Sequence, residues 1–257
     1  MSNLIFSLNA TMPIFLTMIL GLFFRKVGIL DESFTSKMNK FVFKIALPVL
    51  LFQDLSDSDF SAVWDIKFVL FCFFATLLSI LAVWGLSHLL KERSARGEFI
   101  QAAYRSSAAI FGIAFIQNIY GEAGMRPLMI VASVPLYNIM AVVVLTVMRP
   151  ERGRINGALI RKTLHGIITN PIIVGILTGV VWSVLKLPMP VILEKTVKNV
   201  AVLATPLGSA TTDSSYVMAR NMGHKGVLTS SVVMLTTLLS AFTLTGWLYL
   251  LKVQGLV

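Results

Sequence analysis

The sequence is poor in charge and in cysteine. Only 13% of its 257 residues are charged, about half the share of a soluble domain. Cys72 is the only cysteine, so the chain cannot form an intramolecular disulfide or a thiolate metal site. The three histidines stand apart, and the sequence has no HExxH, GxSxG, Walker or GxGxxG motif. We therefore expect no enzyme activity, no metal and no cofactor.

Long runs of apolar residues make up most of the sequence. Residues 4–24 contain no charged side chain, and a helix needs about 20 such residues to cross a bilayer. Similar runs recur to the end of the chain. They predict eight spans, at about 4–24, 38–53, 64–90, 99–120, 127–148, 164–185, 191–219 and 227–251. The expected fold is all-α, a polytopic transmembrane helical bundle that forms one domain over residues 1–257.

The distribution of charge predicts an orientation. The 22 basic and 12 acidic residues give a net charge of +10, but the basic residues sit in short loops and no nucleic-acid-binding motif is present. Sixteen of the 22 fall in the odd-numbered connections: Arg25, Lys26, Lys37, Lys40, Lys44, Lys91, Arg93, Arg96, Arg105, Arg149, Arg152, Arg154, Arg161, Lys162, Arg220 and Lys225. By the positive-inside rule these connections are cytoplasmic, which places the N-terminus outside an inner (cytoplasmic) membrane.

Two stretches are too polar for helices that face lipid. They cover residues 101–118 and 205–216, where hydroxyls and amides interrupt the apolar background. Irregular or polar backbone at membrane depth is tolerated where it lines a cavity, as in the broken helices of carriers. We expect the substrate to be hydrogen-bonded by Ser106, Ser107, Asn118, Thr211, Thr212, Ser214 and Ser215.

Asp213 is the one carboxylate expected deep inside a span. Such an acid is costly in a membrane and marks a functional site by default, here a proton or cation site. The alternative is a carboxylate near the interface that neighbouring hydroxyls satisfy. Pro48, Gly112 and Pro206 are candidate helix breaks, although a proline can also mark a packing kink or the start of a helix.

Several motifs together resemble the auxin efflux carrier family in its bacterial branch. The resemblance covers nearly the whole chain. It rests on Ala46-Leu47-Pro48, Arg105-Ser106 with Gly112-Ile113, Asn170-Pro171 with Gly175 and Gly179, and Ser214-Ser215-Tyr216 with Ala219-Arg220. Two positions depart from the family pattern, since Ser107 replaces an asparagine and Ala114 replaces a proline.

The resemblance implies a ten-span carrier made of two inverted five-helix repeats. Residues 1–148 would form the first repeat and residues 164–257 a shortened second one, with about 50 residues deleted between Leu207 and Ser214. The implied function is secondary transport of small organic acid anions by alternating access, in a possible homodimer. The alternative is a transport-inactive membrane protein that acts only as a structural or interaction partner.

Overall fold

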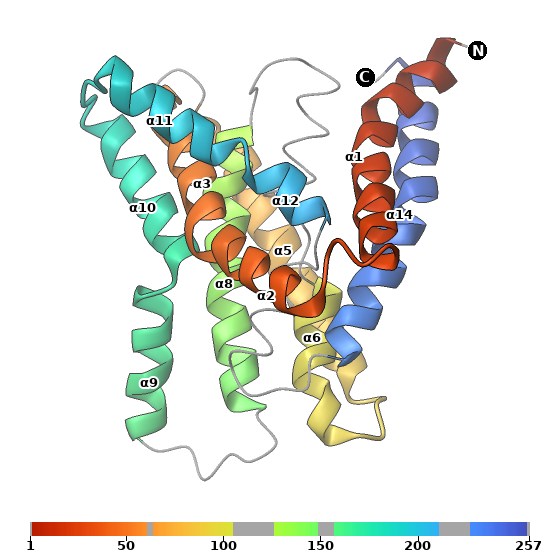
Figure 1. Ribbon diagram of the computed structural model, residues 1–257. Coiled ribbons are helices and arrows are strands. Elements are labelled where there is room, and N and C mark those ends of the chain that lie inside the picture. The colour runs from red at the N-terminus through yellow and green to blue at the C-terminus, as the bar shows by residue number, and fades with distance from the viewer. Residues whose placement is uncertain (1, 61–63, 105–125, 149–156, 211–226, 256–257) are drawn as a thin grey trace.

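The computed structural model describes residues 2–60, 64–104, 126–148, 157–210 and 227–255 (Figure 1). These parts of the chain are helical and contain no strand, which confirms the predicted all-α fold. The elements are α1 (Ser2–Lys26), α2 (Glu32–Phe41), the π-helix η1 (Val42–Ala46), α3 (Leu47–Ser56), α5 (Ile66–Ser87), the 3₁₀-helix η2 (Arg93–Ala95), α6 (Arg96–Tyr104), α8 (Arg126–Val147), α9 (Gly157–Ile168), α10 (Pro171–Val184), α11 (Val191–Ala201), α12 (Ala204–Ala210) and α14 (Val227–Val253).

Three of the described helices are long and apolar enough to cross a membrane: Leu4–Lys26, Ile66–Ser87 and Pro127–Val147. They lie within a few residues of the predicted spans 4–24, 64–90 and 127–148. Large apolar side chains on α5 face outward, with Phe71 69% and Leu78 65% exposed. In water such a surface would drive association, whereas lipid tails solvate it. The count of eight spans remains a prediction.

The predicted span 164–185 is two helices. α9 and α10 meet at an angle of 52° across a break of two residues, and together they make a fourth candidate span. Asn170 caps α10, because its Oδ1 accepts a hydrogen bond from the Ile172 N–H at 3.0 Å. Pro171 fills the first helical position, where its missing N–H costs nothing. The bend therefore arises from a helix start rather than from a kink inside one helix.

Pro48 lies in a helix that continues past it. The backbone of Phe41, Ala46 and Leu47 is right-handed helical, so α2, η1 and α3 follow one another without a break. In the wider π turn the Leu47 N–H donates to the Val42 carbonyl, five residues earlier. A regular α turn would place the proline ring against the carbonyl four residues back, and a π turn relieves that clash. Where a helix break was expected at Pro48, the structure thus has a π-helical turn within a continuous helix.

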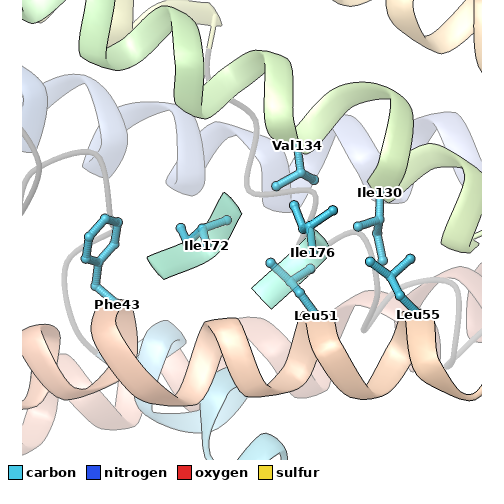
Figure 2. Close-up of a cluster of buried hydrophobic side chains, with 7 residues drawn as sticks. All are labelled: Phe43, Leu51, Leu55, Ile130, Val134, Ile172 and Ile176. Carbon is cyan, nitrogen blue, oxygen red and sulfur yellow. The ribbon is translucent and has the colours of Figure 1, made fainter. Parts of the chain in front are cut away.

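The largest cluster of buried apolar side chains in the described ranges lies between α3, α8 and α10 (Figure 2). Seven buried side chains from η1 and these three helices meet there: Phe43, Leu51, Leu55, Ile130, Val134, Ile172 and Ile176. α3 and α10 approach closely because two glycines of α10 face α3. The GxxxG spacing of Gly175 and Gly179, identified in the sequence as a close-packing face, serves that purpose in the structure.

The predicted span 191–219 is not one helix in its described part. α11 ends at Ala201, and α12 begins at Ala204. α11 carries Glu194, Lys195 and Lys198 within 11 residues and packs against α3, while α12 packs against α1 and η1. Three charges in three turns are incompatible with an apolar crossing, so this segment corrects the expectation of a single long span.

The two ends of the chain lie together at one end of the bundle, where α1 and α14 run side by side (Figure 1). The α10–α11 turn is at this same end. The connection between α5 and α6, which carries Lys91 and Arg93, lies at the opposite end. These two connections therefore lie at opposite ends of the described bundle, and the orientation in the membrane stays a prediction.

Candidate functional site

Most residues proposed from the sequence lie outside the described parts of the chain. This applies to Ser106, Ser107, Asn118, Thr211, Thr212, Asp213, Ser214, Ser215 and Gly112. The helices that border them are described. α6 ends where residues 105–125 begin, α12 precedes residues 211–226, and α14 follows them. The described part of the site therefore consists of the helices that border these residues.

α6 is a short helix surrounded by longer ones. It packs against α5, α8 and α14, and six of its nine residues are buried; Arg96 and Phe99 are half-buried and Ala103 is exposed. Arg96 fixes its first turn, because one guanidinium nitrogen donates to the carbonyls of His88 at 3.2 Å and Leu90 at 3.1 Å. The end of α5 and the start of α6 are thereby tied together.

Three polar side chains follow α6 at intervals of three residues, and we call Glu98, Gln101 and Tyr104 the α6 polar row. Residues three apart lie on one side of a helix, one turn above another. Their exposed fractions are 6%, 0% and 3%. A row of polar groups buried at this depth requires partners, and the three side chains differ in what they find.

Glu98 contacts the first turn of α14. Its Oε2 lies 3.4 Å from the backbone N–H nitrogen of Thr229 and 3.5 Å from the Thr229 hydroxyl oxygen. The first N–H groups of a helix have no partner within the helix, and its N-terminus carries partial positive charge. A carboxylate on α6 therefore stabilises the start of α14, and the helices that border the two polar segments meet at this junction.

Tyr104 joins α6 to α8. Its hydroxyl donates to the Tyr137 carbonyl at 3.0 Å, and the two rings stack with centroids 6.1 Å apart. Both ends of the polar row are thus engaged by a neighbouring helix, Glu98 by α14 and Tyr104 by α8. Such contacts hold the helix that carries the row in a defined position.

Gln101 is the exception in the row. Its side chain is fully buried, and neither Nε2 nor Oε1 has a hydrogen-bond partner in the structure as described. Because both atoms are unpartnered, the result does not depend on which way the amide is turned. A buried polar group without a partner costs about 1–3 kcal/mol, so a carboxamide with two unused donors and an unused acceptor needs an explanation.

Sequence reasoning did not single out Glu98, which lies just before the fourth predicted span at about 99–120. The structure begins α6 at Arg96 and buries Glu98. The spacing of Glu98, Gln101 and Tyr104 was a usable signal, since it aligns three polar residues on one helix. Among the described residues no group of three or more metal-ligating side chains comes together.

A family model described as "Membrane transport protein" matches residues 6–215, about four fifths of the chain. The chain belongs to the auxin efflux carrier family. The resemblance drawn from the motifs is thereby confirmed. No curated protein matches the sequence.

Membership of the auxin efflux carrier family gives the site its general meaning. The family transports small molecules, and its members are embedded in the membrane. The matched region contains α6, residues 105–125 and the first part of residues 211–226, whereas all of α14 lies beyond the match. Polar and ionisable residues buried within a membrane protein are candidates for a functional site.

Proposed function

We propose that the protein is a secondary carrier that moves small organic acid anions across the cytoplasmic membrane by alternating access. The supporting observation is the contact of Glu98 on α6 with Thr229 on α14. α6 leads into residues 105–125 and α14 follows residues 211–226, so the two polar segments extend from one junction. Carriers build a site near the membrane midplane from interrupted polar helices, and the contact between the helices that border the two polar segments supports such a site here.

The proposed binding groups are the neutral hydrogen-bonding residues of the two segments. They are Ser106, Ser107, Asn118, Thr211, Thr212, Ser214 and Ser215. Hydroxyls, amides and the N-termini of half-helices can bind a carboxylate without burying a permanent counter-charge. Asp213 would repel an anion if ionised, and we assign it to a coupling proton or cation.

Alternating access requires two groups of helices that move relative to each other. The core of α3, α8 and α10, with its close glycine contacts, provides one rigid group. The pair α1 and α14 provides the second, and it contacts the first region through α6 and α12. Rocking of this pair would change which end of the bundle opens to the polar segments. We place the N-terminus on the outer side.

The test is uptake by purified protein in proteoliposomes. Labelled malonate, malate and succinate are offered to vesicles with and without protein, and uptake is followed against concentration. We expect saturable uptake of at least one acid, reduced in Ser107→Ala and in Thr212→Ala. A correctly inserted protein without uptake of any of them would instead favour the transport-inactive alternative.

A further inference from the structure

Gln101 differs from the other buried amides in the described part of the chain. Asn138 Nδ2 donates to the Val134 carbonyl at 2.8 Å, and Asn170 Oδ1 accepts from the Ile172 N–H. Gln101 is as deeply buried as Asn138, with 0% against 1% exposed, but neither of its amide atoms has a partner. The fold therefore satisfies amides where they serve structure and leaves this one unsatisfied.

The position of Gln101 relates it to the transport path. It lies one turn after Glu98, which contacts α14, and one turn before Tyr104, which contacts α8. Ser107 follows Tyr104 by three positions in the sequence. Gln101 on α6 therefore lies close in sequence to the first proposed binding segment. The carboxamide is thus held on a helix anchored at both ends, without being used by either anchor.

We propose that Gln101 hydrogen-bonds the transported molecule directly, with its Nε2 amide donating to a carboxyl oxygen of the substrate. This inference rests on the proposed function and adds a residue to its site. A carboxamide offers two donors and one acceptor and carries no charge. It can therefore bind a carboxylate through N–H, or a protonated carboxyl through both N–H and carbonyl, in a region where a charged partner would be costly to bury.

Glu98 adds a constraint on which acid fits. The Glu98 carboxylate lies one helical turn from Gln101, and its negative charge disfavours a highly charged ligand next to Gln101. Gln101 therefore selects for a single carboxyl group at this position, with further charge on the substrate held elsewhere. The neutral amide provides attraction that the neighbouring carboxylate cannot.

Gln101→Met separates this role from a structural one, because methionine has nearly the same shape and no hydrogen-bonding amide. Replacing an unpartnered buried amide with an apolar group does not weaken the empty protein, so its melting temperature should stay equal or rise. Affinity for substrate should fall, with KM raised on the order of tenfold or more. Gln101→Asn, which retains the amide, should recover part of the loss. Gln53→Met on α3 is the comparison, since the Gln53 side chain hydrogen-bonds Asp57: loss of this partnered amide should lower the melting temperature and leave KM unchanged.

Two measurements are made on each variant: uptake of labelled malonate, malate and succinate in proteoliposomes, and the shift in melting temperature that each unlabelled acid causes. The expected result is a lost thermal shift and a raised KM in Gln101→Met alone. Wild-type affinity in Gln101→Met would overturn the inference, as would a fall in its melting temperature without any change in KM or thermal shift. If the wild-type protein shows a thermal shift but no uptake, the proposed transport is contradicted. The role of Gln101 is then decided by comparing the thermal shift of Gln101→Met with that of the wild type. A wild-type protein that shows neither contradicts both.

Discussion

Gly175 of α10 lies directly against the backbone of Pro48 in α3. A Cβ at position 175 would be 2.5 Å from the Pro48 carbonyl oxygen and 2.8 Å from its Cα. Real Cβ atoms do not approach other atoms this closely, so the absence of a side chain sets the distance between the two helices. The helix in contact here is the one that contains the π turn, so the local backbone adjustment at Pro48 and the glycine of α10 form one packing unit.

We expect Gly175→Ala to destabilise the protein. Backbone atoms cannot rotate away as a side chain can, so the helices must separate at a cost of about 1–3 kcal/mol. The thermal unfolding temperature of purified protein in detergent should fall by several degrees. Gly85→Ala in α5 is the control, because a Cβ there meets nothing within 4 Å. An equal effect of the two substitutions would show that the glycine contact does not set the helix distance.

Asn170 at the α9–α10 bend gives a second stability prediction. Asn170→Ala removes the side-chain acceptor for the Ile172 N–H and should cost about 1 kcal/mol. Asn170→Asp retains an acceptor and should lose less. The exposed neighbour in Thr169→Ala serves as control, with thermal unfolding as the measurement. If Asn170→Ala were as stable as the wild type, the cap would be dispensable and the bend would depend on Pro171 alone.

Glu98 gives a third prediction, on the junction of α6 with α14. Glu98→Ala removes a negative charge from the N-terminus of α14 and should cost about 0.5–1 kcal/mol of unfolding free energy. Glu98→Gln retains an oxygen acceptor and should lose less than the alanine variant. Glu92→Gln, at an exposed position of the α5–α6 connection, is the comparison. Protection of α14 amides from hydrogen exchange should decrease at its first turn in Glu98→Ala, and unchanged protection there would argue against the contact.

The predicted orientation can be tested because the chain has one cysteine. In a Cys72→Ser background, Leu187→Cys in the α10–α11 turn and Lys91→Cys in the α5–α6 connection lie at exposed positions on opposite ends of the bundle. A membrane-impermeant maleimide added to intact cells should label position 187 at once and position 91 only after permeabilisation. The reverse pattern would place the N-terminus inside.

Asp57, at the end of α3, gives a prediction about pH. Partial burial raises the pKa of its carboxyl from 3.8, the nearby Glu194 adds to the rise, and hydrogen bonds from Ser56 and Gln53 oppose it. The folded protein therefore binds this proton more tightly than the unfolded chain, and the stabilising contribution is lost as the pH rises from 3.8 through the raised pKa. Between pH 4 and neutral pH, Asp57→Asn should lose less thermal stability than the wild type. Parallel pH profiles of the two proteins would contradict the assignment.

Sequence reasoning located the long apolar helices well. α1, α5 and α8 lie within a few residues of their predicted spans, because composition alone decides whether a 20-residue helix is soluble in lipid. It failed where tertiary contacts decide. Glu98 was expected in a loop but is buried against α14. The segment from residue 191 was expected to be one span, whereas α11 carries three charged residues and ends at Ala201. The π turn before Pro48 depends on how one backbone relieves a local clash, which no residue pattern specifies.

The candidate site could be predicted only in part. The two polar segments follow from sequence, and the residues in them that were expected to bind the substrate lie outside the described ranges. The unpartnered state of Gln101 could not be predicted, because it is a property of the surroundings rather than of the residue. The sequence around a glutamine in an apolar stretch does not show whether its amide has a hydrogen-bond partner.

The contact between α1 and α14 has a consequence for how the protein is made. A hydrogen bond of 2.9 Å joins the hydroxyls of Thr11 on α1 and Thr245 on α14. The two threonines are 234 positions apart. This contact of α1 can therefore form only after the chain has been synthesised through α14, 234 positions further along.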